Sequence, residues 1–400
     1  MTFDKKDTSD LQEEDVVELI NEILEEALKR KTSDIHIAPR EDIIDIRFRI
    51  DGQFYHYKSY SIGIFGYLKR RIKVIGGLKL DENRLPQDGK TSATFGDENV
   101  EFRISSFPTI YGEKIVIRIL SDKKEDLDLK KLGFREESLN KIYKSVEKSQ
   151  GLVLCTGPTG AGKTTTLFSM ITRYNPLNYN IATLEDPVEY RLDGINQTQV
   201  NPNIGFTFAN GLRSLVRQDV DVIMVGEIRD KITVDLAVDA SLTGHAVYSS
   251  IHANSAVATI TRLLKLGMEP FLLASALTLI IAQRLVKKLC TKCKQKHNVS
   301  ESTLATIEAS IGNLVKGSVK DMEFFEAKGC DECNGTGYSG RIVVAEVLEI
   351  TPEVEVLILE SAHEADIVKA AVSQGMLSIQ QEALIKAASG ITSISEALKV

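Results

Sequence analysis

The feature that most constrains this chain is a glycine-rich string from Gly157 to Thr164, which matches the pattern G-x-x-x-x-G-K-[ST]. The apolar run GLVLCT ends directly before the string, and a segment typical of a helix, Thr164 to Tyr174, follows it. A strand, a glycine-rich turn and a helix in this order form a loop whose backbone N–H groups surround phosphate oxygens. The string therefore predicts a nucleotide site inside a fold that contains a parallel sheet.

Residue types within the string have separate chemical roles. Glycines let the backbone approach phosphate without a clashing Cβ, Lys163 supplies positive charge to the β- and γ-phosphates, and the Thr164 hydroxyl is a ligand for Mg²⁺. A simple glycine-rich turn is the alternative, but the strand–loop–helix context argues against it. The residues predicted to bind ATP are Gly157, Pro158, Thr159, Gly160, Ala161, Gly162, Lys163, Thr164 and Thr165.

Length and composition place this string in a folded chain of two or three domains. The 400 residues are 43% hydrophobic and 26% charged, which excludes collagen-like, mostly disordered and disulfide-stabilised classes. The longest apolar-rich run, Pro270 to Ala282, is shorter than the roughly 18 residues that a membrane-spanning helix needs. We therefore expect a cytoplasmic protein.

Residues 1–120 are predicted to form a small α+β domain. An acidic amphipathic helix is expected from about Asp15 to Lys31, because apolar residues recur there at helical spacing. The runs IHI, IIDIRFRI, NVEFRIS and EKIVIRIL alternate as strands do, and a basic helix is expected from Phe65 to Ile75. Residues 121–137 are rich in charge and are predicted to be a linker.

Residues 138–400 are predicted to form an α/β domain. The runs GLVLCT, YNIATLE, DVIMVGE and HAVYSSI alternate with helical segments, as parallel strands buried on both faces do. A cysteine-bearing insertion is expected at about residues 286–340. After it, GRIVVAEVLEI is predicted to be a strand, and residues 361–400 are predicted to be helical.

Two carboxylates and a histidine stand at the ends of predicted strands. Glu185 ends the run IATLE, Glu227 ends the run DVIMVGE, and His252 follows AVYSSI. In an open parallel sheet the carboxyl ends of the strands point toward the ligand. We expect Glu227 and Glu185 to share water activation and metal binding, in an order that the sequence does not assign, and His252 to sense the γ-phosphate. Solvent-exposed acids and a structural histidine are the alternatives.

The cysteines predict a metal site. Two Cys-x-x-Cys pairs, Cys290 with Cys293 and Cys330 with Cys333, favour metal over disulfides in a cytosolic chain. Four thiolates leave no open coordination position, so a structural Zn²⁺ site is predicted. The segment between the pairs, residues 294–329, is longer than the usual spacing, and four reduced thiols without a metal are the alternative.

The charge pattern gives no support for a nucleic-acid partner. The net charge is −7, and the basic run from Arg284 to Lys296 lacks the aromatic residues that stack on bases. We expect this run to be a solvated face or a face that meets an acidic partner.

Four segments, in order, carry a resemblance to a known family. GPTGAGKTTTL, ATLEDPVEY, LRSLVRQDVDVIMVGEIRD and SLTGHAVYSSIHAN resemble the Walker A, Asp box, Walker B and His box of the bacterial secretion ATPases, the GspE/PilB family. SDIHIAPR and IRFRIDG resemble that family's second amino-terminal domain, and RLPQDGK with EFRISSFPTIYGEKIVIRIL resembles its interface segment. The resemblance runs from about Asp15 to the end of the chain. It implies a PAS-like α+β domain followed by a RecA-like ATPase domain with a zinc insertion.

The resemblance also implies a ring with a shared site. In the family's homohexamers, arginines of the PAS-like domain complete the active site, and the matching residues here are Arg103 and Arg118. Arg284 in AQRLV matches an arginine near the nucleotide, as do Arg213 and Arg217. In the Walker B segment a glycine stands where an aspartate is common, so Mg²⁺ is expected to rely on Thr164 and on other carboxylates.

For function, the resemblance implies a motor. The tetracysteine element is typical of the assembly and secretion branch, so ATP hydrolysis with Mg²⁺ is expected to power type IV pilus assembly. The expected partner is an inner-membrane platform protein, which would hold the motor at the inner face of the cytoplasmic membrane. The longer regulatory amino-terminal domains of many relatives have no counterpart in these residues, so recruitment is expected to differ or to depend on the acidic helix.

Other functions stay open at this point. A type II secretion or competence pseudopilus ATPase and a pilus retraction motor would share these motifs, although the cysteines argue against retraction. A RecA-like nucleic-acid translocase would share the P-loop but not the His and Asp boxes. A scaffold that binds nucleotide without turnover is the last alternative. The sequence decides neither the fibre system nor the symmetry of the ring.

Overall fold

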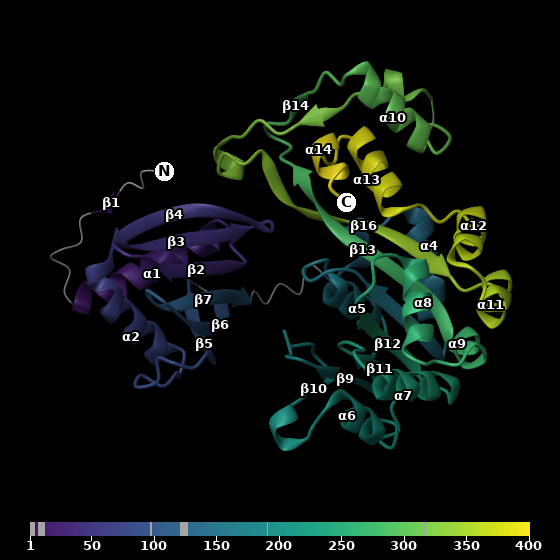
Figure 1. Ribbon diagram of the computed structural model, residues 1–400, viewed down its shortest axis with the longest axis horizontal. Helices are drawn as coiled ribbons and strands as arrows, with labels where there is room; N and C mark the ends of the chain where they lie inside the picture. Colours follow the sequence, from purple (N-terminus) through teal and green to yellow (C-terminus); the bar gives the residue numbers. More distant parts are fainter. Residues whose placement is uncertain (1–4, 7–12, 97, 121–126, 190, 316) are drawn as a thin grey trace. The chain divides into compact units, whose positions relative to one another are not determined.

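A computed structural model describes residues 5–6, 13–96, 98–120, 127–189, 191–315 and 317–400 (Figure 1). The chain divides into two compact units, Met1–Lys123 and Lys124–Val400. Within the described ranges, no helix combines the length and the apolar character that a bilayer span requires.

The first unit is a sheet with helices on one face (Figure 1). Its described strands are β1 (Lys5–Lys6), β2 (Asp34–Pro39), β3 (Ile43–Ile50), β4 (Gln53–Ser61), β5 (Gln87–Phe95), β6 (Glu98–Thr109) and β7 (Gly112–Leu120). Its described helices are α1 (Glu13–Lys29) and α2 (Phe65–Ile75), and a short turn, η1 (Ile62–Ile64), precedes α2. The strands lie in the order β1-β4-β3-β2-β7-β6-β5, and β1 alone is parallel to its neighbour among these described strands.

Alternation of side chains explains why the helices cover only one face of this sheet. In β6, Phe102 and Ile104 are buried in the core with α1 and α2, whereas Arg103 between them points to the opposite face. The predicted helices and the strands β2, β3, β6 and β7 all occur. Strands β4 and β5 were not predicted, because β5 has no fully buried residue and β4 has only Ser59 and Tyr60. Pairing with neighbours, rather than an apolar pattern, holds these two strands in place.

The second unit is an α/β layer structure, as predicted. Its main sheet contains β8 (Gly151–Thr156), β9 (Ile181–Glu185), β10 (Asn196–Gln199), β11 (Val222–Val225), β12 (Ala246–Ile251), β13 (Leu277–Leu289) and β16 (Tyr338–Glu349). The order is β10-β9-β11-β12-β8-β13-β16, and the described pairs are parallel except for β13 with β16. A separate two-stranded antiparallel sheet pairs β14 (Gln295–Lys296) with β15 (Phe325–Glu326).

Helices cover both faces of this sheet (Figure 1). One face carries α3 (Leu129–Leu132), α4 (Glu136–Val146) and α5 (Lys163–Ile171). The core on the other face includes residues of α6 (Phe208–Leu215), α7 (Lys231–Leu242), α8 (Ala256–Lys265), α9 (Pro270–Ala276), α10 (Glu301–Ile311), α11 (Pro352–Leu359), α12 (Glu364–Ser373), α13 (Ile379–Ala388) and α14 (Ile394–Ala397). Short 3-10 turns are η3 (Pro202–Ile204), η4 (Val319–Asp321) and η5 (Asp331–Cys333).

Strand β8 shows how the sequence pattern produces this layering. Leu152 and Leu154 belong to one core, and Val153 and Cys155 belong to the other. Because alternate side chains point to opposite faces, a strand buried on both faces is continuously apolar. This run ends at the P-loop, Gly157–Thr164, so the phosphate-binding loop starts from a strand that is fixed from both sides.

Three details of the second unit differ from the sequence predictions. The apolar run at residues 270–282 is split, because α9 ends at Ala276 and the unpredicted strand β13 begins at the next residue. The cysteine-bearing insertion occupies residues 290–337, between the end of β13 and the start of β16. The basic run predicted to be solvated lies partly inside β13, and Lys287 is buried with its Nζ 3.5 Å from Oε1 of Glu396.

The range predicted to be a linker is folded in its second half. Residues 121–126 lie outside the described residues. From α3 onward the chain packs into the second unit, where Leu129 and Phe134 are buried against α5 and its neighbours. The apolar residues of this charged segment therefore belong to the core of the second unit.

Candidate active site

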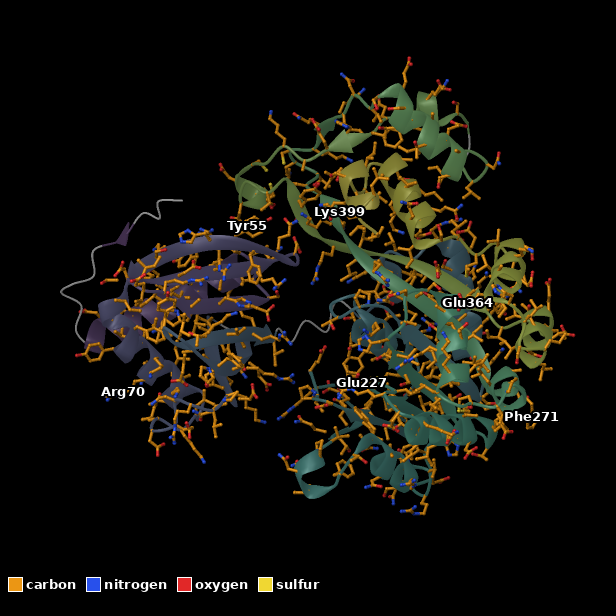
Figure 2. The ribbon with its side chains drawn as sticks, in the orientation of Figure 1. Tyr55, Arg70, Glu227, Phe271, Glu364 and Lys399 are labelled. Atoms are coloured by element: carbon orange, nitrogen blue, oxygen red, sulfur yellow. The ribbon has the colours of Figure 1, made fainter. Side chains whose placement is uncertain are left out.

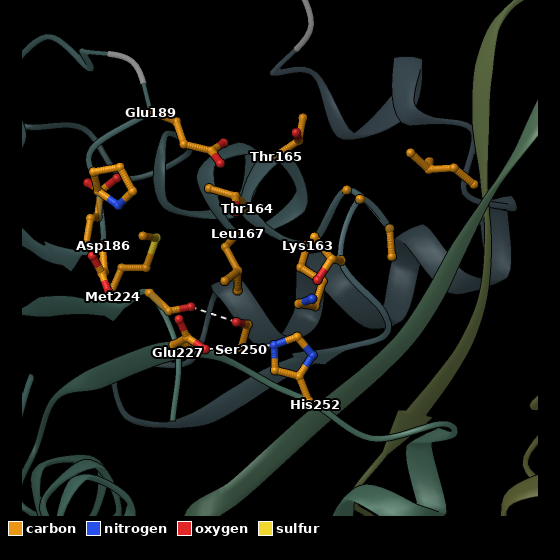
Figure 3. Close-up of a pocket in the computed structure, with 18 of the residues that line it drawn as sticks. Lys163, Thr164, Thr165, Leu167, Asp186, Glu189, Met224, Glu227, Ser250 and His252 are labelled. Carbon is orange, nitrogen blue, oxygen red and sulfur yellow. Dashed lines mark hydrogen bonds and ion pairs between the residues drawn. The ribbon is translucent and has the colours of Figure 1, made fainter. Parts of the chain in front are cut away.

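Neighbouring parallel strands of the second unit end at the same edge of the sheet. The P-loop follows β8, Asp186 follows β9, Glu227 follows β11, and His252 follows β12. Because β9, β11, β12 and β8 are adjacent and parallel, these segments open onto one cavity of about 380 Å³. Figure 3 shows the side chains that line it, and Figure 2 shows Glu227 within the whole unit.

The P-loop has the conformation that its glycines allow. Gly157, Gly160 and Gly162 have φ values of +145°, +79° and +83°, a region that favours glycine. Nζ of Lys163 donates hydrogen bonds to the carbonyl oxygens of Gly157 at 2.9 Å and of Pro158 at 3.1 Å. Burial lowers the pKa of Lys163, and the nearby charge of Glu227 opposes that shift. The ammonium group is thus held inside the loop where a phosphate would lie.

Glu227 lies between the side chains of Arg229 and His252. Arg229 donates a short hydrogen bond to its Oε1, and Nε2 of His252 lies 3.8 Å from its Oε2. The Arg229 guanidinium also lies 3.9 Å from Oδ2 of Asp186, and so connects the segments after β9 and β11. In Figure 3 the His252 ring and the Glu227 carboxylate face each other in the cavity. The carboxylate is 17% exposed, so a water molecule can reach it.

Glu185 differs from Glu227 because the described residues give it no oppositely charged partner. Its side chain is 2% exposed, and its Oε1 accepts hydrogen bonds from Thr183 Oγ1 at 2.6 Å and Gln197 Nε2 at 2.9 Å. Its Oε2 has no hydrogen-bond partner among the described residues, although it is buried. Burial raises the pKa of this carboxyl group, and the hydrogen bonds from Thr183 and Gln197 oppose the shift. A cation or a water molecule at Oε2 would supply the missing partner.

The donor set at this end of the cavity fits Mg²⁺. Thr164 is the second residue of α5, and both Thr164 and Glu185 line the cavity. A hydroxyl and a buried carboxylate oxygen without a partner are the hard oxygen ligands that Mg²⁺ prefers. Asp186 and Glu189 supply further carboxylates in the same cavity.

Not every predicted nucleotide residue faces this cavity. The cavity is lined by Thr159 to Thr165, while Gly157 and Pro158 lie at the base of the loop. Arg284 is not among the lining residues, because its guanidinium donates to the backbone of Gln283 and Asn254. The other two predicted arginines do not line it either. They are Arg213 on α6 and Arg217 just after this helix, and both are exposed.

The predicted arginine pair lies together on the first unit. Arg103 of β6 is directly opposite Arg118 of β7, so both guanidinium groups share one face of the sheet. Nε of Arg118 donates to Oδ1 of Asp34 at 2.9 Å. The register continues this row to Lys90 on β5 and, through Asp34 on β2, to Arg49 on β3. The Asp34 carboxylate pairs with Arg118 and Arg49, so the row holds several cations around one carboxylate.

Several residues at the site escaped the sequence analysis. Arg229 is two positions after Glu227. This spacing was a usable signal, because in extended backbone the side chains of residues i and i+2 point to the same side. Gln197 and Arg341 had no local signal, because the sheet order brings them to the site, whereas Thr183 lies on the same strand as Glu185, two residues before it. The buried amide of Gln283, which donates to the Ala161 carbonyl oxygen at 2.6 Å, depends on β13, a strand that was not predicted.

The four cysteines of the insertion form one cluster. Their Sγ atoms all lie within 4.8 Å of one another, and all have free thiols. The separations are 3.9 Å for Cys290–Cys330, 3.8 Å for Cys293–Cys333 and 3.7 Å for Cys330–Cys333. Tetrahedral Zn²⁺ with Zn–S bonds of about 2.3 Å places its sulfurs about 3.8 Å apart, so the spacing fits zinc.

Backbone groups around this cluster suit bound thiolates. The N–H groups of Cys330 and Gly337 donate to Sγ of Cys333 at 3.2 and 3.1 Å. The fifth cysteine, Cys155, is different, since it is buried in β8 and burial raises its thiol pKa to about 12. Its role is therefore packing.

Most of the chain matches a single protein family. The model of the type II/IV secretion system protein family matches residues 9–399. The chain is 42% identical over 383 residues to the type IV pilus assembly ATPase PilB of Myxococcus xanthus, which covers 95% of this chain and 67% of that protein. It is 40% identical over 398 residues to the type II secretion system protein E of Pseudomonas aeruginosa, covering 98% of this chain and 78% of that protein.

Solved structures share the fold. The ATPase DotB of Legionella pneumophila gives a TM-score of 0.69 at 21% identity and covers 95% of this chain and 94% of its own, which supports the fold alone. The pilus retraction motor PilT with bound ADP gives a TM-score of 0.63 at 26% identity, covering 95% and 96%. The family match and the curated relatives together show that this chain belongs to the type II/IV secretion system protein family, as its four boxes predicted.

Proposed function

We propose that this chain is a Mg²⁺-dependent ATP hydrolase that works as a homohexamer and powers the assembly of a type IV pilus. The observation that carries the proposal is the meeting of the P-loop, Glu185, Glu227 and His252 in one cavity. Identities of 42% and 40% to PilB proteins over almost the whole chain support the choice of fibre. The work would be done on the cytoplasmic side of the membrane, against an inner-membrane platform protein.

The P-loop would bind the phosphates of ATP. Its backbone N–H groups and the amino end of α5 offer partial positive charge, and Lys163 offers a full charge. The Lys163 ammonium group would exchange the carbonyl oxygens of Gly157 and Pro158 for oxygens of the β- and γ-phosphates. Thr164 and Glu185 would hold Mg²⁺, which when bound supplies Lewis-acid stabilisation of charge on the phosphates.

Glu227 is the proposed base for the attacking water. Its carboxylate is 17% exposed at the cavity, whereas Glu185 is almost completely buried, so Glu227 is the better placed of the two to accept a proton from water. In this structure Arg229 and His252 hold its oxygens. A γ-phosphate that takes His252 as a donor would release Oε2 for the water proton, which is how His252 would sense the nucleotide.

Phosphate release tests this assignment. We expect Glu227→Gln to lower the rate of phosphate release by about 10²- to 10⁴-fold, the size of a general base effect, while binding of a fluorescent ATP analogue is kept. Lys163→Ala should lose binding as well. Glu353→Gln, an exposed change on α11, is the matched control. Phosphate release by Glu227→Gln at the wild-type rate would contradict the role of Glu227 as the base. If neither protein released phosphate, a nucleotide-binding scaffold would be supported.

The arginine row of the first unit is proposed to act on a neighbouring subunit's nucleotide. A guanidinium can neutralise charge on the transferred phosphoryl group, an effect of roughly 10³ to 10⁵ in other phosphoryl-transfer systems. A nucleotide phosphate against this face in the assembled ring would give Arg103 and Arg118 an anionic partner in addition to Asp34.

Mixed rings test the action between subunits. Arg118→Gln and Lys163→Ala proteins should each be inactive, but rings assembled from both should regain turnover, because some intact P-loops then meet intact arginines. Arg70→Gln on α2, on the side of the sheet away from the row, is the control and should stay active alone (Figure 2). No recovery in mixed rings would contradict action in trans.

A type II secretion motor is the second candidate. The 40% identity to type II secretion system protein E over 98% of this chain favours it as a specific alternative. Deletion of the gene separates the candidates, since loss of surface pili supports assembly and loss of an exported protein supports secretion. Hyperpiliation would indicate a retraction motor, and hydrolysis stimulated by DNA would indicate a translocase.

A further inference from the structure

The loop that carries His252 is held by its backbone at successive positions. The Thr156 hydroxyl at the end of β8 accepts from the Ala253 N–H at 2.8 Å and donates to the Ala253 carbonyl at 3.0 Å. The Ala256 N–H, at the start of α8, donates to Oε2 of Glu346 at 2.8 Å. Between these two anchors, Nη2 of Arg284 donates to the Asn254 carbonyl oxygen at 3.2 Å.

Arg284 also lies against the P-loop. Its Nη1 donates to the Gln283 carbonyl oxygen at 2.9 Å, and a Cβ added to Gly157 would lie 3.2 Å from that same Nη1. The neighbouring Gln283 side chain holds Ala161, at the other side of the loop. One short stretch of β13 therefore contacts both the P-loop and the loop after β12.

A partly buried carboxylate, that of Glu346, lies on the same face of the sheet as the Arg284 side chain. Glu346 lies on β16, and its direct partner on β13 is Ala282, two residues from Arg284, so both side chains lie on one face. Burial lowers the pKa of Arg284 and raises that of Glu346, and in both cases the charge of the other residue opposes the shift. The two groups thus stabilise each other's charged forms beside the loop.

We infer that Arg284 is a positioning residue that fixes the His252 loop against the P-loop and does not bind the nucleotide. The pair of Arg284 with Glu346 sets the distance between the loop that holds phosphate and the side chain that responds to it. This inference rests on the proposed function for its kinetic consequence. The geometric part of the inference does not rest on the proposed function, because Arg284 donates to the backbone of Asn254 and is not among the residues that line the cavity.

Kinetics separate a positioning role from a nucleotide contact. We expect Arg284→Gln to lower kcat about 10- to 100-fold, as loss of a charged hydrogen bond predicts, while the Kd of a fluorescent ATP analogue changes less than about twofold. Arg284→Lys should recover part of kcat, because an ammonium group can still donate to Asn254. Lys288→Gln removes an exposed charge from the same strand and should behave as wild type. A Kd at least about tenfold weaker with kcat kept would overturn the inference.

A double variant tests whether the effect passes through His252. In a His252→Ala background, adding Arg284→Gln should cause no further loss of kcat, because the side chain that Arg284 positions is already gone. Losses that multiply would show that Arg284 acts elsewhere and would overturn the inference.

Amide hydrogen exchange tests whether Arg284 holds the His252 loop, and it does not require turnover. Amides of residues 253–256 should exchange faster in Arg284→Gln than in wild type, while Lys288→Gln leaves them unchanged. Unchanged exchange in Arg284→Gln would overturn the inference. If wild-type protein released no phosphate, the proposed hydrolase function would fail alone, and the exchange result would still decide the role of Arg284.

Discussion

Each unit of this chain contains a carboxylate that is almost fully buried, and the surroundings of these two carboxylates are opposite in kind. Glu113 in the first unit and Glu185 in the second are both 2% exposed. Glu113 is paired with Lys73, whose Nζ lies 2.8 Å from Oε1, and with Lys69 at 3.3 Å. Glu185 receives only neutral donors, and one of its oxygens has no hydrogen-bond partner among the described residues.

The difference separates charges that hold a fold from charges that await a ligand. The first unit completes its own ion pair, and Lys73 also donates to the Glu82 carbonyl oxygen at 2.7 Å, which ties the segment after α2 to the helix. The second unit leaves Glu185 incompletely bonded at a cavity, and it brings four cysteine sulfurs together without a cation of its own. The contribution of Glu113 to stability should therefore depend on pairing with lysine side chains, and that of Glu185 on a bound ligand.

The largest effect is expected from breaking the internal pair. Glu113→Gln leaves the Lys73 ammonium buried without its counter-charge, so the first unit should lose about 3–5 kcal/mol of unfolding free energy. For a unit of this size, calorimetry should show its unfolding temperature falling by roughly 10 °C or more. Glu41→Gln, exposed in the same unit, is the control. A drop in nucleotide binding by the second unit, or an unchanged unfolding temperature, would contradict this comparison.

An intermediate effect is expected from removing the metal of the cysteine cluster. Wild-type protein should contain zinc by elemental analysis, and Cys330→Ser should lose it, because three thiolates and a hydroxyl bind Zn²⁺ more weakly than four thiolates. The second unit should then unfold a few degrees lower, whereas the first unit is unaffected. Cys155→Ser is the control for zinc content, since Cys155 lies outside the cluster. Full zinc content in Cys330→Ser would contradict the assignment.

The smallest effect is a pH dependence at Glu185. Burial raises the folded-state pKa of this group above 4.5, so the folded protein binds its proton more tightly than the unfolded chain does. Its contribution to stability is therefore present at low pH and is lost as pH rises from 4.5 through the folded pKa. Glu185→Gln has no titrating group at this position and so cannot lose this contribution. As pH rises, the free energy of unfolding of Glu185→Gln should increase relative to that of wild type, by no more than about 1–2 kcal/mol. The unfolding temperatures of the two proteins measure this change.

This pH measurement has its own control and its own contrary result. It uses nucleotide-free protein, because Mg²⁺ and ATP would supply the missing partner of Glu185 and reduce the difference. Thr183→Val removes one donor to the same carboxylate and should enlarge the wild-type pH dependence. A temperature difference that stays constant with pH would show that Glu185 carries no unpaired charge in the folded state.

Local sequence was sufficient to predict which side chains of the second unit stand at the strand ends. The P-loop, Glu227 and His252 each directly follow an apolar run, and the carboxyl ends of neighbouring parallel strands meet at one edge. The cysteine pairs were also readable, since each lies within one short turn. In these cases the chemistry depends on residues close in the chain, next to an element with a strong pattern.

Features that depend on long-range register were not predictable in this way. The row that contains Arg103 and Arg118 exists only because β6 and β7 pair in one register, and its continuation to Lys90 needs β5, a strand without an apolar pattern. The role of Arg284 could not be seen without β13, which places its guanidinium on the backbone of Asn254. Resemblance brought these arginines to notice, but their contacts required the fold.

The row of cations on the first unit limits where this chain can change length during evolution. One residue inserted into β6 or β7 would turn Arg103 or Arg118 toward the core, where an unpaired guanidinium is costly. Extra residues at Ile110 and Tyr111, the exposed tip between the two strands, leave the pairing unchanged. Homologous chains should therefore gain or lose residues at this tip and keep both strands at constant length.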